Sequence, residues 1–316
     1  MDSEGKLRVL VSGASGLIGS ALSGLLKKEG HEVWTLVRRK AGEREIAWDP
    51  KAGILSPDDL VGLDAVVHLA GATIASRWTS ERKREIRESR VTGTRLLAES
   101  LAGLEKKPSV FLSASAIGFY GNRGEEEIGE DSAPGEGFLP EVCREWEAAA
   151  SPAREAGIRT VNLRTGIVLT PRGGALAQML LPFKLGLGGP TGNGRQWMSW
   201  ISLTDEVFAI RHALLNPRLE GPVNLTAPKP VRNSVFAQVL GKALARPAFM
   251  PLPAFAVKAI FGEMGQNLLL DGQKVLPHKL TESGYVFSHP DLASALRFEL
   301  GKGELLSERM AVEDGI

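Results

Sequence analysis

The feature that most constrains this chain is a glycine-rich turn between an apolar run and an amphipathic segment near the N-terminus. The run Leu7–Val11 predicts a buried strand, and Gly16–Glu29 carries apolar residues at helical spacing. Between them, Gly13, Gly16 and Gly19 follow one another at intervals of three residues. Such glycines allow a tight turn, a close backbone approach to a pyrophosphate and close packing of helix on sheet. Strand, turn and helix in this order predict a dinucleotide-binding unit.

Strands and helices alternate along the first half of the chain. Further strands are predicted at His31–Val37, Ile46–Trp48, Asp64–Leu69, Val110–Ser115 and Arg159–Arg164, and helices at Ser80–Leu104 and Pro140–Ala156. Repeated strand–helix–strand units favour the α/β class, with a Rossmann-type, doubly wound parallel sheet.

The pattern changes after Thr170, where glycine-rich loops and proline-punctuated segments surround shorter helices. We therefore expect residues 1–170 to form the nucleotide-binding Rossmann domain, with later segments near 195–225 returning to it. Residues 171–316 are expected to form a smaller, mostly helical substrate or lid domain.

Composition excludes several functional classes. The 316 residues include 38 basic and 37 acidic side chains, a net charge of +1, so no partner nucleic acid or membrane is expected. Cys143 is the single cysteine and the five histidines lie far apart, which argues against a metal site. The first apolar run starts at Leu7, and no apolar stretch approaches the roughly 20 residues of a membrane helix. We expect a cytoplasmic monomer or homodimer that binds a small-molecule substrate.

The residues after the second strand bear on the choice of nucleotide. NAD-specific sites usually place an acidic residue there, against the ribose hydroxyls. Here the sequence reads Val37-Arg38-Arg39-Lys40, and no acid occurs before Glu43. Cations at this point favour NADP(H), with Arg38 best placed to clamp a 2′-phosphate. The alternative is a solvated basic turn.

Longer motifs give the chain a family resemblance. The Gly-x-x-Gly-x-x-Gly spacing resembles that of extended short-chain dehydrogenases/reductases. Further blocks that resemble this family are Asp64–Gly71, Arg90–Leu97 (with Arg90 where asparagine is usual), Ser113–Ser115, Leu163–Gly166 and Trp200–Asp205. Leu180–Pro190 and Leu270–Pro277 resemble the atypical "epimerase family" branch, which carries a C-terminal domain of unknown function.

This resemblance implies an NADP(H)-dependent oxidoreductase or an epimerase-like protein whose substrate is unidentified. The alternative is a non-catalytic sensor or regulatory protein that binds NADP(H). Together with the glycine turn and the basic residues, it implies a cofactor site made of Gly13, Ser15, Gly16, Leu17, Ile18, Gly19, Arg38, Arg39, Leu69, Ala70, Gly71, Glu85, Arg90, Ser113, Arg164 and Val168.

The chain departs from the family at the catalytic residues. Ordinary members use Tyr-x-x-x-Lys, in which the lysine lowers the tyrosine pKa for proton transfer. This chain has two tyrosines, Tyr120 and Tyr285, and no lysine between positions 108 and 183. Alignment on the Trp146-Glu147 pair predicts Glu141 near the tyrosine position and Glu145 near the lysine position.

Three residues are candidates for the missing role. Ser115 could hydrogen-bond a substrate oxygen, or be structural. Glu141 could act as a base if burial raised its pKa, but an exposed residue in a first helical turn is the alternative. Tyr120 could donate a proton, or line the substrate site.

Two further features have open interpretations. Arg90 could bind cofactor phosphates or an anionic substrate, or form a salt bridge to Glu85 or Glu88. The loop Gly192–Trp200 could cover the nicotinamide, or its tryptophans could pack a domain junction.

Overall fold

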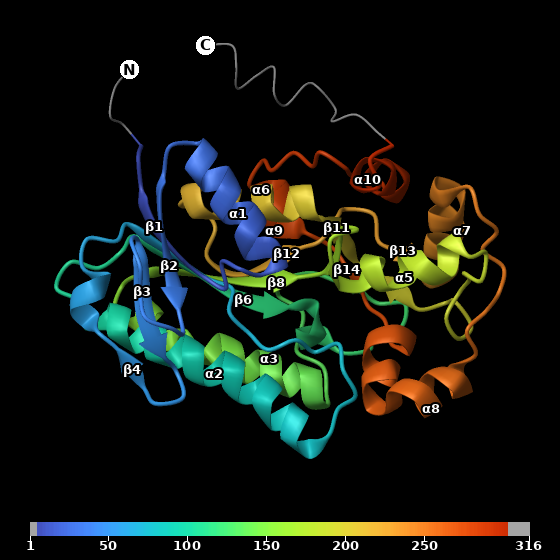
Figure 1. The fold of residues 1–316 in the computed structure, drawn as a ribbon, viewed down its shortest axis with the longest axis horizontal. Helices are drawn as coiled ribbons and strands as arrows, with labels where there is room; N and C mark the ends of the chain where they lie inside the picture. The colour runs from blue at the N-terminus through green and yellow to red at the C-terminus, as the bar shows by residue number, and fades with distance from the viewer. Residues whose placement is uncertain (1–4, 303–316) are drawn as a thin grey trace, which may run out of the picture. The chain divides into compact units, whose positions relative to one another are not determined.

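The computed structural model describes residues 5–302, which form two compact units (Figure 1). Among these residues, the first unit comprises 5–119, Ala133–Arg164 and Val207–Val223. The second comprises Tyr120–Ser132, Thr165–Glu206 and 224–302. The chain therefore passes from one unit to the other several times.

The first unit is built on a single eight-stranded sheet. This sheet confirms the predicted Rossmann-type fold. Its strands are β1 (Arg8–Ser12), β2 (Glu32–Val37), β3 (Glu45–Asp49), β4 (Ile54–Leu55), β5 (Ala65–His68), β6 (Val110–Ala116), β8 (Arg159–Thr165) and β12 (Gly221–Leu225). Their spatial order is β12-β8-β6-β5-β1-β2-β3-β4. The pairs β1–β2, β1–β5, β2–β3 and β5–β6 are parallel, and β4 is an antiparallel edge strand.

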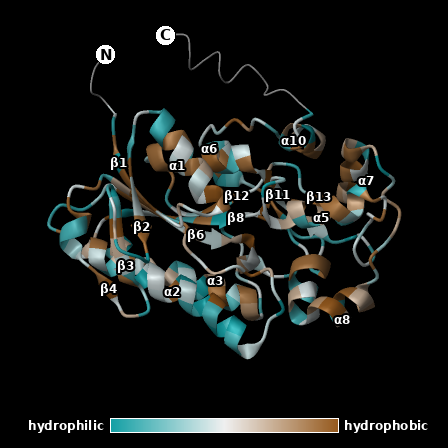
Figure 2. Ribbon diagram, in the orientation of Figure 1, coloured by the Kyte–Doolittle hydropathy of each residue, from teal (hydrophilic) through white to brown (hydrophobic). Residues whose placement is uncertain are grey.

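Helices cover both faces of this sheet, as a doubly wound fold requires. Helix α1 (Leu17–Lys28) lies on one face, and α2 (Ser80–Ala102), α3 (Phe138–Ala149) and α4 (Ser151–Glu155) on the other (Figure 1). The core between α2, α4 and the sheet includes Leu97, Leu101, Ala153, Val66 and Phe111. The N-terminal part of α2 is strongly hydrophilic (Figure 2).

The second unit is mostly helical and carries three two-stranded ladders. Its helices are α5 (Gly174–Lys184), α7 (Asn233–Leu244), α8 (Ala254–Gly265), α9 (His278–Glu282) and α10 (Leu292–Glu299). The ladders join β7 (Glu127–Ile128) to β14 (Lys274–Val275), β9 (Ile167–Leu169) to β11 (Trp200–Ser202), and β10 (Trp197–Met198) to β13 (Val231–Arg232). Trp200 and Phe236 are the largest side chains of its core.

A buried carboxylate fixes the late part of the second unit. Asp205, on α6 (Leu203–Leu215), accepts hydrogen bonds from the Tyr285 hydroxyl at 3.0 Å and from the backbone N–H groups of Ser288 at 2.7 Å and His289 at 2.9 Å. Charge-assisted bonds of this kind are short and comparatively strong. They tie the segment after α9 to the start of α6.

Within residues 5–302, no helix is both long and apolar enough to cross a membrane. The same residues contain no cluster of three or more His, Cys, Asp or Glu side chains that could hold a metal ion.

A buried serine–histidine pair joins the ends of β1 and β5. The Ser12 hydroxyl accepts backbone N–H groups of Leu69 at 3.0 Å and Ala70 at 3.2 Å, and lies 2.6 Å from His68 Nδ1. Because Ser12 Oγ already accepts two donors, we infer that it donates to Nδ1, which places the imidazole proton on Nε2. The ring is fully buried beside Trp48, and burial lowers the pKa of His68 to about 4.

This burial predicts a pH-dependent loss of stability. The folded-state pKa lies below the ordinary value of about 6.5, so the unfolded chain binds the extra proton between roughly pH 6.5 and 4. The stabilisation is complete above that range and is lost as pH falls. Replacing His68 by Asn keeps an acceptor for Ser12 and removes the titration. Between about pH 7 and pH 5, the stability advantage of the unmodified chain over His68→Asn should fall by about 2 kcal/mol.

Urea unfolding of both proteins at the two pH values measures this difference. The comparison with the variant is needed because burial raises the pKa of Glu206 to about 8, and that carboxyl makes the folded chain less stable as pH rises. A constant difference between the two proteins would contradict the assignment of a neutral, buried His68.

Candidate functional site

The candidate site lies where the strand order of the sheet reverses. From β1 the chain continues to β2 on one side, and β5 adds to the other side of β1. In open parallel sheets, ligands bind outside the carboxyl ends of the strands at such a switch point. Here those ends are Ser12, Val37 and His68.

The glycine turn after β1 is shaped by two close contacts. Gly13 has a φ of 67°, and a Cβ on it would lie 2.9 Å from the Leu69 carbonyl carbon and oxygen. A Cβ on Gly19 would lie 2.3 Å from the Gly13 oxygen, so α1 can pack against the turn only with glycine here. The turn and the end of β5, including Leu69 and Ala70, are therefore held together.

The start of α1 offers an open anion site. Ser15 and Gly16 are exposed, Leu17 and Ile18 are partly exposed, and the first turn of α1 contains no acidic residue. Free backbone N–H groups and the positive end of the helix dipole favour a phosphate at such a position. The glycine turn thus fits a pyrophosphate.

The basic turn after β2 presents one uncommitted arginine. Arg38 is exposed, and among residues 5–302 it has no hydrogen bond or ion pair. The neighbouring Arg39 is engaged: it donates two hydrogen bonds of 2.7 Å to Glu45, and these bonds lower the Glu45 pKa. Arg38 is therefore free to meet a ligand, as is the exposed Lys40, whereas Arg39 braces the turn.

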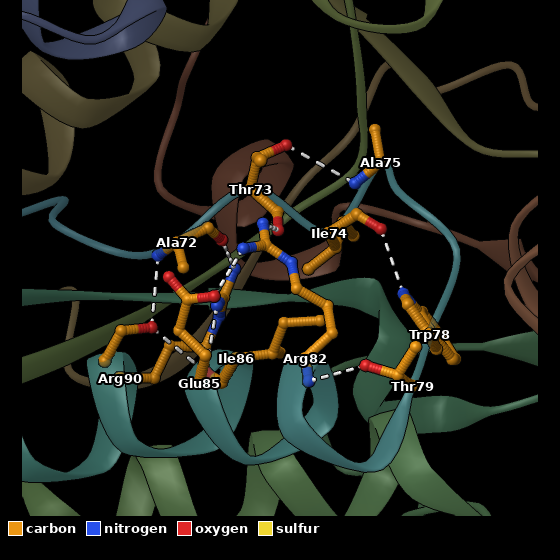
Figure 3. Close-up of polar contacts among 11 residues, drawn as sticks. Ala72, Thr73, Ile74, Ala75, Trp78, Thr79, Arg82, Glu85, Ile86 and Arg90 are labelled. Carbon is orange, nitrogen blue, oxygen red and sulfur yellow. Dashed lines mark hydrogen bonds and ion pairs between the residues drawn. The ribbon is translucent and has the colours of Figure 1, made fainter.

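Arg90 fastens the segment after β5 to α2 (Figure 3). Its guanidinium donates to the carbonyls of Ala72 and Ile86, at 3.0 Å each, and lies over the Trp146 ring at 5.0 Å. A Cβ on Gly71 would be 3.4 Å from Arg90 Cζ, so the arginine supports this segment from beneath. Burial lowers the pKa of Arg90.

The alternative interpretation of Arg90, a salt bridge to Glu85 or Glu88, is not present among the described residues. Glu85 pairs with Arg82 at 2.5 Å, and Glu88 pairs with Arg84 at 4.0 Å. Arg82 also donates to the Thr73 carbonyl, which adds a second clamp on the same segment (Figure 3). Glu85 is half-exposed and is committed to this clamp.

A buried ion pair lies beyond the end of β6. Arg164 donates to Glu147 from Nε at 2.8 Å and from Nη2 at 2.9 Å, and its guanidinium lies 3.6 Å from the Phe119 ring centroid. Ser115 donates to the same Glu147 at 2.7 Å. The Ser115 hydroxyl and the Arg164 guanidinium are thus occupied by a carboxylate of α3. Ser113 is fully buried, and its hydroxyl has no partner among the described residues.

The face of α3 toward β6 carries no acid or base at the spacing of the family dyad. A Cβ on Gly118, just after β6, would lie 3.4 Å from Leu139 Cβ and 3.8 Å from Cys143 Sγ. Leu139 and Cys143 are therefore the pair that faces the end of β6. Burial, the main cause, raises the pKa of the Cys143 thiol to about 12.

Glu141 and Glu145, predicted near the dyad positions, point toward α2 in the structure. Both side chains are nearly half exposed and pair with Arg87 of α2, at 3.3 Å and 3.5 Å. Glu141 is exposed in the first turn of α3, as in the alternative interpretation.

The remaining predicted residues lie in the second unit. Tyr120 is fully buried, and its hydroxyl donates to Asn224 Oδ1 at 2.7 Å. Val168 lies in β9 and pairs with Ile201 of β11. Of the two loop tryptophans, Trp200 belongs to the unit's core, whereas Trp197 is partly exposed, with Arg232 4.2 Å from its ring centroid.

Sequence reasoning missed two parts of the site. Glu147 was not predicted as a site residue. Its position on the same helical face as Cys143 and Trp146 indicates a buried carboxylate. The serine–histidine pair had no such signal, because Ser12 and His68 are 56 residues apart and meet only through strand register.

Comparison with known proteins places these features in a family. The profile of the NAD dependent epimerase/dehydratase family matches residues 9–225, and a domain of unknown function (DUF1731) matches residues 252–299. The chain is 44% identical over 292 residues to Epimerase family protein MT2273 of Mycobacterium tuberculosis, covering 92% of this chain and 96% of that protein. It is 41% identical over 295 residues to human Epimerase family protein SDR39U1, covering 92% and 99%.

A solved structure agrees with these relatives. The crystal structure of human epimerase family protein SDR39U1 (isoform 2) with NADPH has a TM-score of 0.86 and 39% identity, covering 93% of this chain and 99% of that one. By sequence profile, by identity over almost the whole chain and by fold, this chain belongs to the NAD-dependent epimerase/dehydratase family, in the epimerase family branch that includes SDR39U1.

Proposed function

We propose that this chain binds NADP(H) at the switch point of its Rossmann sheet and uses it as an oxidoreductase or epimerase-like enzyme on a small molecule. The observation that carries the proposal is the exposed, unpaired Arg38 at the end of β2, beside a glycine turn that fits a pyrophosphate. The NADPH in the related human structure gives independent support.

Arg38 favours the phosphorylated cofactor for an electrostatic reason. A guanidinium makes forked, charge-assisted hydrogen bonds to phosphate, and Arg38 has no carboxylate partner to displace first. Glu45, the nearby acid in the turn, is already neutralised by Arg39. A 2′-phosphate would meet net positive charge.

The residues of such a site would hold the cofactor, and the cofactor itself would supply the redox chemistry. A bound nicotinamide supplies or accepts a hydride. Gly13, Gly16 and Gly19 would hold the pyrophosphate, and Leu69 and Ala70 would lie along the adjoining wall set by Ser12. The Arg164–Glu147–Ser115 group would keep the floor at the end of β6 rigid without offering a proton.

A second function, NADP(H) sensing without turnover, is favoured by the α3 face. Leu139 cannot transfer a proton, and a thiol with a pKa of about 12 stays neutral at physiological pH. An enzyme built on this site would need a substrate whose reaction takes its proton from solvent or from the substrate itself. A sensor needs no such group.

Cofactor preference tests the role of Arg38. We expect NADPH to bind at least about tenfold tighter than NADH, a difference of about 1.4 kcal/mol. Arg38→Asp should remove or reverse this preference, because the carboxylate repels a 2′-phosphate. Calorimetric titration of both cofactors measures it, with Lys107→Asp as a control for net charge. Equal affinities in the unmodified chain would sink the assignment.

Substitutions at three glycines, the N-cap residue of α1 and two within the helix, distinguish an effect on cofactor binding from an effect on folding. Gly16→Val should abolish NADPH binding while the chain stays folded, because Gly16 has an ordinary φ of −76° and its Cβ contacts only the Gly13 oxygen, at 3.1 Å. Gly19→Ala should lower both stability and binding, because its Cβ collides with that oxygen at 2.3 Å. Gly24→Ala, which meets nothing within 4 Å, should stabilise the chain by about 0.5–1 kcal/mol and leave binding intact.

Thermal melts and NADPH titrations of the three variants give the result. Normal binding by Gly16→Val would show that the phosphate cradle lies elsewhere.

Turnover assays separate the enzyme from the sensor. With NADPH, we expect little or no reduction of simple aldehydes and ketones and little epimerisation of sugar nucleotides, because no proton shuttle faces β6. Hydride exchange with a metabolite extract would favour the enzyme, and tight binding without exchange the sensor.

Any activity should fall more in Ser115→Ala or Arg90→Gln than in Tyr120→Phe, because the Tyr120 hydroxyl is buried against Asn224. Loss of activity in Tyr120→Phe alone, with normal folding, would show that the proton carrier is Tyr120.

A further inference from the structure

The second unit exposes large apolar side chains on neighbouring segments. They belong to the end of α5 and to the stretch that leads from α7 into α8. We call them the apolar face: Leu181, Leu185, Leu187, Phe249, Met250 and Phe255. Phe249 is 73% exposed and Phe255 is 76% exposed. A contiguous patch of such residues, unlike scattered single ones, usually marks an interaction surface.

Backbone contacts hold the two segments of the apolar face side by side. The Met250 N–H donates to the Gly188 carbonyl at 3.1 Å, and the Leu252 N–H donates to the Pro190 carbonyl at 2.9 Å. Arg246 Nε donates to the Lys184 carbonyl at 3.0 Å, where α5 ends. The face is therefore one surface supported by main-chain bonds, and Figure 2 shows hydrophobic residues continuing along α8.

Most charges near this surface are positive, although α8 also carries the exposed Glu263 near its end. Lys184, Lys242, Arg246 and Lys258 are exposed, and none of them has an ion pair among the described residues. Neither of the two stretches that build the face, residues 156–204 and 221–262, contains a single Asp or Glu. An apolar surface whose neighbouring charges are mostly cations complements a partner that is apolar and anionic.

A pocket of about 450 Å³ opens within the cationic rim. Lys242 and Arg246 line it together with the Phe249 side chain. Gln238 and Ser234, which lie one and two helical turns before Lys242 on α7, also line it. Two cations, a hydroxyl and an amide beside an aromatic ring suit a phosphate or carboxylate head with an apolar body attached.

We propose that the apolar face docks on an anionic phospholipid bilayer, with a lipid headgroup in the Lys242–Arg246 pocket and Phe249 and Phe255 at the acyl boundary. Interfacial binding combines buried apolar area with attraction to anionic lipid, and this surface presents both. A second copy of the chain fits less well, because a twofold contact would bring the same cations together. The overall net charge of +1 does not reveal this surface, because the sum over the whole chain combines a mostly cationic surface with acidic segments elsewhere.

Flotation with lipid vesicles tests the proposal on the full chain loaded with NADPH. We expect binding to vesicles of phosphatidylcholine with about one-third phosphatidylglycerol to exceed binding to pure phosphatidylcholine at least about tenfold, and to weaken with added salt. The double variants Phe249→Ser/Phe255→Ser and Lys242→Gln/Arg246→Gln should each lose most of the binding. NADPH affinity should stay unchanged, which shows that the variants are folded.

Matched controls lie in the first unit. Ile54→Ser removes a side chain that is 61% exposed, and Lys106→Gln/Lys107→Gln removes two exposed cations; neither should alter vesicle binding. Equal binding to neutral vesicles, no binding to either vesicle, or full binding by the two face variants would overturn the proposal. Binding of monomeric short-chain phosphatidylglycerol without vesicle binding would also overturn the proposal, because it indicates a single lipid molecule as the ligand. A concentration-dependent dimer that Phe249→Ser/Phe255→Ser abolishes would overturn it as well, because it indicates a second copy of the chain on the apolar face.

Discussion

The Ser12 hydroxyl is the contact on which the cofactor site depends. It joins β1 to the backbone of Leu69 and Ala70, and it fixes His68 between Trp48 and Phe111. The turn after β1 passes close to the end of β5, because a Cβ on Gly13 would lie 2.9 Å from the Leu69 carbonyl. The edge of the candidate cofactor site is thus held by a buried polar contact as well as by apolar packing. In a low-dielectric interior such a contact is strong when satisfied and costly when broken.

The sequence predicted the fold well because its signals are local. The glycine spacing, the apolar strands and the change of texture after Thr170 each lie within a few residues, and the predicted sheet is present. Side-chain orientation was harder. Aligning Trp146-Glu147 with a family motif placed Glu141 and Glu145 at the dyad positions, whereas helical geometry turns Leu139 and Cys143 toward β6. An error of two positions on a helix rotates a side chain by about 200°, so a small misalignment reverses the face.

The partners of the buried arginines were the other feature of the candidate site that could not be predicted from the sequence. Arg164 resembled a cofactor contact and Arg90 a phosphate ligand, but each arginine meets a protein acceptor: Glu147 for one, the carbonyls of Ala72 and Ile86 for the other. Nothing in the local sequence distinguishes an arginine that waits for a ligand from one that supports a loop. Arg38 differs because it follows a strand end directly, where the fold itself leaves the side chain outside the sheet.

These placements change how the missing dyad is understood. The sequence left Ser115, Glu141 and Tyr120 as candidates for the missing role, each with a structural alternative. In the structure, Leu139 and the neutral Cys143 thiol face the end of β6, and Ser115, Arg164 and Glu147 are bonded to one another. A chain that keeps the glycine turn and the unpaired Arg38 without the family dyad retains the features expected to hold a nicotinamide cofactor. The groups that would hold the cofactor and those that would move a proton are separate on this scaffold.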